Sequence, residues 1–171
     1  MKIEIKKVKG NIIDMIERGE ITATAHGCNC FHTMGSGIAK TFNQYTNGQL
    51  LEADKNTVYG DINKLGDISH IDFNNVTFFN IYSQFVYGGQ TKGTSDDLVY
   101  VHWESVYRAL YKIIFNLPHN GNNVLALPYI GCGLAGGKEK DLINVLDKIA
   151  NSSRIFGLDM NLTILLVEFQ T

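Results

Sequence analysis

The chain alternates between short apolar segments and amphipathic segments along its whole length. In residues 2–8 apolar side chains alternate with charged ones, which is typical of a half-exposed strand at a sheet edge. Residues 124–127 are apolar throughout, as in a strand that is covered on both faces. Residues 161–169 form another apolar segment. These patterns predict strands near both ends of the chain and in its second half.

Shorter apolar segments predict three more strands. Residues 21–25 form one, which breaks at His26 into small and polar residues. Residues 66–73 and 76–82 form two more, and the Asn74-Asn75 pair between them is typical of a hairpin turn. The sheet should therefore contain an antiparallel pair.

Apolar residues at helical spacing predict the helices. The strongest pattern is the stripe Val106, Leu110, Ile113 and Leu117. We place the start of this helix at Asp96 and Asp97, whose charges suit a helix N-terminus, and its end at Pro118. The other helices are predicted at residues 12–17, with Asn11 as the N-cap, 37–45, 50–55 and 138–150.

Alternation of strands and helices predicts an α/β fold, a three-layer α/β/α sandwich around a mixed central sheet. At 171 residues we expect one domain, residues 1–171. In such folds ligands bind beyond the carboxyl ends of the strands. The positions that follow the predicted strands therefore become the candidates for a site.

Two glycine-rich loops occupy such positions. Gly35-Ser36-Gly37 precedes the helix at residues 37–45, and residues 131–137, GCGLAGG, precede the helix at 138–150. Glycine lets an anion approach backbone N–H groups closely, and a helix N-terminus adds further donors. Two such loops on one small domain predict a site for a ligand that contains a diphosphate.

Composition excludes several function classes. Hydrophobic residues make up 44% of the chain and charged residues 19%, which is ordinary for a globular protein. No apolar run approaches the ~20 residues of a membrane span, and the first residues lack the apolar core of a signal peptide, so we expect a cytoplasmic protein without a membrane partner. A net charge of −2 with scattered lysines excludes a footprint for duplex nucleic acid.

The residues that hold metals or triphosphates are missing. Cys28, Cys30 and Cys132 lack zinc-site spacing, so we expect reduced thiols, and no acidic cluster suggests a metal. The chain contains neither the phosphate-binding loop GxxxxGK[ST] nor the dinucleotide fingerprint GxGxxG with its later acidic residue. We therefore expect no cofactor and no metal.

Four segments in order resemble a known family. They are residues 9–12 (KGNI), 26–30 (HGCNC), 34–39 (MGSGIA) and 128–134 (PYIGCGL). Together they resemble the macro domain, an ADP-ribose-binding module, over nearly the whole chain. The match is strongest to the branch that processes ADP-ribose-1″-phosphate, which includes yeast and bacteriophage members. The resemblance implies the macro domain fold and a ligand that is ADP-ribose or ADP-ribose-1″-phosphate.

The resemblance also implies residue roles. The side chain of Asn11, where many members have Asp, would accept a bond from the adenine amino group, and Ile12, next to Gly10, would bind the ring through its backbone. Phe169 would stack on the adenine. Asn29 would bond the distal ribose. The remaining ligand-binding residues would be Met34, Gly35, Ser36, Gly37, Ile38, Tyr82, Ser83, Gln84, Ile130, Gly131, Cys132, Gly133, Leu134 and Ala135.

For catalysis the resemblance favours His26, assisted by Asn29 and by the carboxylate of Asp97. Imidazole can activate water, attack phosphorus or protonate a leaving group near neutral pH. The alternative is a structural His26 that bonds a loop carbonyl, and a charge at a helix start for Asp96 or Asp97.

Three functions follow from the resemblance. The first is a metal-free phosphatase that converts ADP-ribose-1″-phosphate to ADP-ribose. The second is a hydrolase that removes ADP-ribose from protein or nucleic acid. The branches with this activity carry Asp in one of two places, where this chain has Ile38-Ala39 and Ala135. Lys92 is in the region of a lysine that one branch uses, but the Asp that would act with it is missing. The third is a non-catalytic reader or sponge of ADP-ribose. In each case we expect a monomer in the cytoplasm, or in the host cytoplasm if a phage encodes it.

Overall fold

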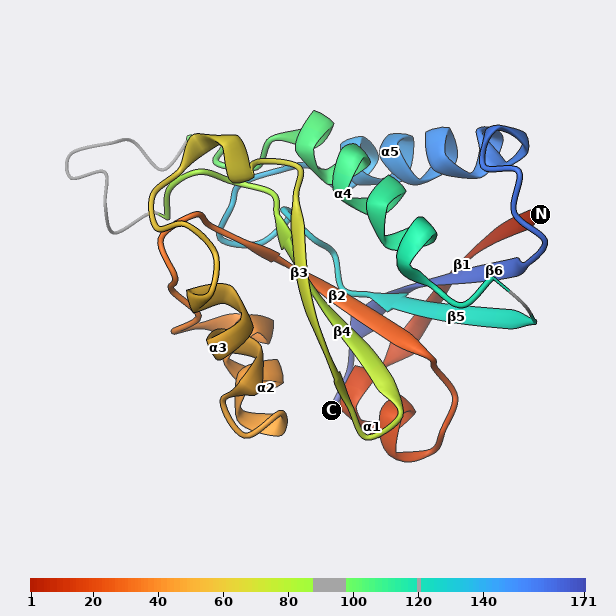
Figure 1. The fold of residues 1–171 in the computed structure, drawn as a ribbon, viewed down its shortest axis with the longest axis horizontal. Helices are drawn as coiled ribbons and strands as arrows, with labels where there is room; N and C mark the ends of the chain where they lie inside the picture. The colour runs from red at the N-terminus through yellow and green to blue at the C-terminus, as the bar shows by residue number, and fades with distance from the viewer. Residues whose placement is uncertain (88–97, 120) are drawn as a thin grey trace.

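A six-stranded mixed sheet forms the centre of the computed structural model, which describes residues 1–87, 98–119 and 121–171 (Figure 1). The strands are β1 (Lys2–Gly10), β2 (Ala23–Cys28), β3 (Ile68–Phe73), β4 (Val76–Tyr82), β5 (Asn122–Leu127) and β6 (Asn161–Phe169). Their order is β1-β6-β5-β2-β4-β3, and every pair is parallel except β3 with β4. The predicted mixed sheet is confirmed.

Helices cover both faces of the sheet (Figure 1). They are α1 (Ile12–Glu17), α2 (Gly37–Tyr45), α3 (Gln49–Lys55), α4 (Trp103–Asn116) and α5 (Glu139–Asn151), with short 3₁₀ turns at Ile62–Lys64 and Ser153–Ile155. The buried side chains of α4 and α5 form one core with one face of the sheet, and those of α1, α2 and α3 form a second core with the other face. The fold is therefore the predicted α/β/α sandwich.

Residues 124–127 of β5 show why a strand in the middle of the sheet is apolar at successive positions. Leu125 and Leu127 pack into the core under α4 and α5, whereas Ala126 packs into the core on the α1 side. Successive side chains of a strand point to opposite faces, so a strand covered on both faces has no polar side.

The predicted hairpin is also confirmed. β3 and β4 pair antiparallel up to Phe73 and Val76, and the two residues between them, Asn74 and Asn75, have φ angles of 52° and 61°. Positive φ at both central positions is the geometry of a type I′ turn, which Asn tolerates better than most residues.

Two predicted boundaries are wrong. β2 was expected to end at Ala25 but continues to Cys28, because residues 26–28 pair with β4. His26 therefore lies inside a strand and not after one. α4 begins at Trp103, with His102 as the N-cap, and not at Asp96 and Asp97. Those two aspartates, and Lys92, lie outside the described residues.

Candidate functional site

A cavity of about 570 Å³ lies beyond the carboxyl ends of three parallel strands. Gly27 and Asn29 reach it from β2, Ser83 and Gln84 from β4, and the loop 128–135 from β5. The N-terminus of α2 and the residues before it form the remaining wall. A volume of this size is typical of small-molecule sites, and the position is the one expected for ligands of α/β folds.

The first glycine loop delivers the N-terminus of α2 to this cavity. Ser36 is the N-cap, in extended conformation, and its side chain caps no backbone group. Gly37 follows with φ of 58°, a conformation that favours glycine. In the part of the chain that the structure describes, the N–H groups of Ser36, Gly37 and Ile38 donate to no acceptor. A helix start with free donors is an anion-binding feature.

The second glycine loop folds back on itself. Gly136 N donates to Gly133 O at 3.0 Å, and Gly137 N donates to Gly131 O at 2.7 Å. Three residues of this loop line the cavity, namely Gly133, Leu134 and Ala135. Their N–H groups have no acceptor among the described residues. The two loops therefore present two sets of free backbone donors to one cavity.

The glycines of the second loop have different structural roles. A Cβ at Gly131 would lie 2.6 Å from the side chain of Val101, and one at Gly137 would lie 2.6 Å from Trp103. Packing against the segment before α4 therefore requires glycine at both positions. Gly133 has no such neighbour, and a Cβ there would meet nothing within 4 Å. Only Gly133 leaves its surface open.

Most of the predicted ligand-binding residues line the cavity. They are Asn29, Met34, Gly35, Ser36, Gly37, Ile38, Ser83, Gln84, Ile130, Gly131, Gly133, Leu134 and Ala135. The amide of Asn29 also holds its own loop, since Nδ2 donates to Thr33 O at 3.2 Å and Oδ1 accepts from Phe31 N at 2.8 Å. Asn29 therefore shapes the wall to which it belongs.

The residues predicted for adenine form a separate group. Gly10 pairs with Phe169 at the ends of β1 and β6, and Phe169 is 65% exposed. Asn11 is the N-cap of α1, and its oxygen accepts from Ile13 N at 2.9 Å. Ile12 is buried. None of these four residues lines the cavity, and the oxygen assigned to adenine already has one donor.

The structure does not place His26 at the cavity. The ring is fully buried against Phe42 of α2, and Nε2 lies 2.6 Å from Oδ1 of Asn80. Asn80 Nδ2 donates to Leu50 O and to Ser69, so its oxygen must accept, and His26 donates from Nε2. Burial lowers the pKa of His26 to about 4, so the ring is neutral near pH 7. His26 thus bonds a side chain of β4 and not the loop carbonyl of the structural alternative, and it does not line the cavity; its catalytic role stays a prediction.

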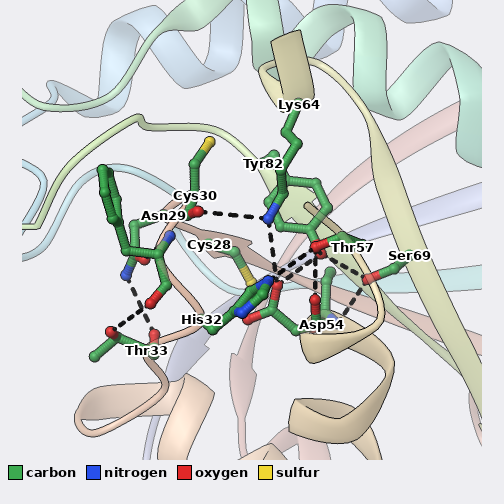
Figure 2. A network of polar contacts seen from close by, with 12 residues as sticks. Cys28, Asn29, Cys30, His32, Thr33, Asp54, Thr57, Lys64, Ser69 and Tyr82 are labelled. Atoms are coloured by element: carbon green, nitrogen blue, oxygen red, sulfur yellow. Dashed lines mark hydrogen bonds and ion pairs between the residues drawn. The ribbon is translucent and has the colours of Figure 1, made fainter. Parts of the chain in front are cut away.

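Tyr82 belongs to a buried polar network (Figure 2), and it packs in the same core as Phe42, which His26 contacts. Its hydroxyl donates to Oδ1 of Asp54 at 2.8 Å, and the Lys64 ammonium lies 4.5 Å from its ring centre. Lys64 and Asp54 are 7% and 1% exposed and lie 4.0 Å apart, and Lys64 also donates to Cys30 O. Burial raises the pKa of Tyr82. Tyr82 is not among the residues that line the cavity, and its role at a ligand stays a prediction.

The cavity side holds a hydroxyl with no partner. Ser83 is 1% exposed, and its Oγ makes no hydrogen bond within the described chain. Gly27 lies directly opposite, where a Cβ would come within 2.6 Å of this oxygen. Cys132, in contrast, points away from the cavity lining, and its Sγ lies 3.6 Å from Ile130 O.

Several lining residues were not predicted, namely Gly27, Thr33, Ala39, Tyr87, Pro128 and Tyr129. Most flank predicted residues directly, so their position along the chain was the available signal. Tyr129 also lines a shallower cavity beside Lys9 and Glu168, at the ends of β1 and β6. It therefore lies between the main cavity and the residues predicted for adenine.

Charge is absent from the described lining, which contains no Lys, Arg, His, Asp or Glu. No group of three or more His, Cys, Asp or Glu within residues 1–87, 98–119 and 121–171 could hold a metal ion. No helix in these ranges is long and apolar enough to cross a membrane. Asp97, predicted to be catalytic, lies outside the described residues. The described cavity thus offers neutral hydrogen-bonding groups only.

Comparison with known proteins finds a phage relative. No family model matches the chain. The chain is 33% identical over 167 residues to the "uncharacterized 17.5 kDa protein in tk-vs intergenic region" of Enterobacteria phage T4, which covers 91% of this chain and 96% of that protein.

Solved structures with the same fold include several macrodomains. The macrodomain of Mycobacterium tuberculosis DarG matches with a TM-score of 0.61 at 16% identity, over 95% of this chain and 97% of its own. Thermosipho africanus DarTG in complex with ADP-ribose matches with 0.61 at 14% identity, over 95% of this chain and 41% of its own. A Trypanosoma brucei macrodomain in complex with ADP matches with a TM-score of 0.64 at 12% identity, over 94% of this chain and 63% of its own. These likenesses show the macrodomain fold.

Proposed function

Since the chain belongs to the same family as the 17.5 kDa protein of phage T4 and has the macrodomain fold, we propose that its cavity binds ADP-ribose-type nucleotides. The carrying observation is that two sets of free donors, residues 36–38 and 133–135, line one cavity. A diphosphate presents acceptor oxygens on several sides at once. Two separate sets of backbone donors in one cavity suit that distribution.

The neutral lining supports the same ligand. Backbone amides can bind a phosphate without a lysine or arginine, because the dipoles of a loop and a helix start supply partial positive charge. The apolar walls, Ile130 and Ala135 among them, exclude water and strengthen these bonds. On this proposal the adenosine extends past Tyr129 towards Phe169, whose exposed ring is available for stacking.

A negative charge introduced into the second loop tests the proposal. Gly133→Glu has room for its side chain, because a Cβ at Gly133 meets nothing within 4 Å. The new carboxylate would repel the diphosphate, so calorimetry should show micromolar-range binding of ADP-ribose to the wild type and at least about a 100-fold loss in the variant. Asn151→Glu, with the same charge at the far end of α5, is the matched control. Equal binding by all three proteins would contradict the proposal.

Hydrolysis of ADP-ribose-1″-phosphate is a second candidate. Asp97 lies in segment 88–97, outside the described residues. The observation in favour of hydrolysis is the position of the described residues on either side of this segment. Tyr87 lines the cavity, and Leu98 O lies next to Gly136, where a Cβ would come within 2.7 Å of it. Tyr87, the last described residue before the segment, thus lies at the cavity, whereas His26 is buried within β2.

Phosphate release, with EDTA present, separates the two candidates. If Asp97 and not His26 is the catalytic residue, the wild type should release phosphate. Asp97→Asn should then abolish this activity, whereas His26→Gln should keep it. If the wild type releases no phosphate but binds ADP-ribose, the protein is a reader or sponge. If His26→Gln alone abolishes turnover without loss of the fold, His26 is catalytic in spite of its burial.

A further inference from the structure

Lys64 is a buried cation whose hydrogen bond goes to a loop beside the cavity and not to its counter-ion. The side chain is 7% exposed, and its Nζ lies 4.0 Å from Oδ1 of Asp54, beyond hydrogen-bond distance. Of the atoms that the structure describes, the ammonium donates to one acceptor, Cys30 O, at 3.5 Å. Burying a charge is costly, and an apolar pair in the same space is often as stable. The place of this ammonium therefore calls for a reason besides stability.

Cys30 O belongs to the peptide group that holds the side chain of Asn29. The N–H of the same group is that of Phe31, which donates to Oδ1 of Asn29 at 2.8 Å. A peptide group is planar and trans, so its carbonyl and its N–H point in opposite directions. Figure 2 shows Lys64 reaching the carbonyl end of this unit. Lys64 and the Asn29 amide therefore hold the two ends of one rigid group.

The charge on Lys64 strengthens the bond at the far end of that group. A cation at a carbonyl oxygen polarises the peptide, and this makes the N–H on its other side a stronger donor. Gly60 N also donates to Cys30 O, at 2.8 Å, but it carries no charge. Gly60 thus ties the loop to residues 58–61, whereas Lys64 adds the polarisation that reaches Phe31 N.

Asn29 lines the cavity with an amide that has one orientation. Its Oδ1 accepts from Phe31 N, and its Nδ2 donates to Thr33 O at 3.2 Å. A rotated amide would satisfy neither bond, because only the oxygen accepts and only the nitrogen donates. An amide nitrogen carries two hydrogens, so one remains for a ligand. The stronger the bond to Phe31 N, the more firmly this donor is held in place.

We infer that Lys64 is a positioning residue of the site, which fixes the amide of Asn29 through the peptide group between residues 30 and 31. Lys64 itself does not line the cavity, so it acts on the ligand only through this group. A binding group whose orientation is locked by its neighbours loses less freedom when the ligand arrives. The inference rests on the proposed function and adds a residue that acts from behind the cavity wall.

A neutral replacement of the ion pair separates positioning from stability. Asp54→Leu together with Lys64→Met leaves neither charge buried alone, so the free energy of unfolding should stay near that of the wild type. Calorimetry should nevertheless show ADP-ribose affinity about tenfold lower, because Asn29 is no longer held. Asn123→Ala is the matched control, since Asn123 is 3% exposed, donates to Pro118 O at 2.9 Å and does not line the cavity. The control should lose stability and keep affinity.

A double-mutant cycle with Asn29 tests the route through the peptide group. Asn29→Ala alone should also lower the affinity about tenfold, and adding the neutral replacement should lower it no further, because Lys64 acts through this amide. Independent effects would multiply to about a hundredfold and would overturn the inference. If the first replacement does not fold, Asp54→Asn with Lys64→Gln takes its place. The glutamine nitrogen stops one atom short of the lysine nitrogen and does not reach Cys30 O, so the same loss is expected.

The outcomes separate the inference from the proposed function. A wild type that does not bind ADP-ribose overturns the proposed function and the inference with it. A wild type that binds ADP-ribose, with a folded neutral replacement that binds it equally well, overturns the inference alone. The same holds if neither neutral replacement folds, since the ion pair is then an element of the fold and not a device of the site.

Discussion

Tyr82 and Ser83 are consecutive residues at the end of β4, yet they belong to opposite sides of the sheet. Tyr82 points towards α2 and α3, where its hydroxyl bonds Asp54 and Ser69 under the ammonium of Lys64 (Figure 2). Ser83 points into the cavity and finds no partner among the described residues. Side chains alternate along a strand, so one residue of displacement separates a structural site from a binding site.

β2 shows the same division. His26 and Cys28 pack on the α2 side, where burial raises the pKa of Cys28 and lowers that of His26. Gly27 and Asn29 line the cavity. Buried ionisable groups, namely His26, Asp54 and Lys64, lie outside the cavity and are paired within the protein, whereas the described cavity lining is neutral and keeps free donors. Among the described residues, His26, Cys28, Asp54 and Lys64 therefore lie outside the cavity lining.

The largest expected effect comes from breaking the buried ion pair. Lys64→Met would leave the Asp54 carboxylate buried without its cation, and should lower the free energy of unfolding by about 3 kcal/mol or more. Urea denaturation measures this. Lys55→Met, at an exposed position on the last turn of α3, should change stability by less than about 0.5 kcal/mol. Similar stabilities for the two variants would show that the pair is not a structural element.

The second effect is a dependence of stability on pH caused by His26. Its pKa is about 4 in the folded protein and ordinary, near 6.5, in the unfolded chain. The unfolded state alone binds the proton between these values, so stability is complete above pH ~6.5 and falls by up to about 3 kcal/mol as the pH drops to ~4. His26→Gln should flatten this profile in urea denaturation. An unchanged profile would assign the pH dependence to other groups.

The third effect concerns the cavity side. Gly27→Ala would place a methyl group 2.6 Å from the Ser83 hydroxyl and 3.2 Å from Ile130. The side chains must shift into the space that the ligand needs, so ADP-ribose affinity should fall at least about tenfold while the protein stays folded. Calorimetry together with circular dichroism measures both. Retained affinity would mean that the ligand does not reach the strand ends.

The smallest effect is that of salt. Because the described lining carries no charged side chain, raising NaCl from about 50 to about 300 mM should weaken ADP-ribose binding less than about threefold. A site that depended on lysines would lose much more. A steep salt dependence in calorimetry would therefore indicate a cation at the site.

Periodicity was sufficient to predict most of the fold. Three local patterns predicted their elements correctly. The apolar run of β5 predicted a buried strand, the Asn74-Asn75 pair a hairpin, and the amphipathic stripe of α4 a helix. The glycine loops likewise predicted the cavity wall, since few other arrangements explain glycines after a strand and before a helix. Local pattern failed where long-range pairing decides the outcome.

The end of β2 is the clearest such failure. Residues 26–28 are small or polar and resemble a loop, but pairing with β4 keeps them in the strand. Because each extra strand residue reverses the side to which a side chain points, the error in the boundary became an error in the place of His26. The buried Lys64–Asp54 pair was equally hidden, since charged residues in a polar segment suggest a solvent-exposed surface.

Amide chemical shifts in a titration with ADP-ribose test the division between the two sides most directly. We predict the largest shifts at the free donors of residues 36–38 and 133–135, and small shifts at Asp54, Lys64 and His26. The opposite distribution, with the largest shifts at Asp54, Lys64 and His26, would contradict the account. So would a spectrum that ADP-ribose leaves unchanged at every described residue.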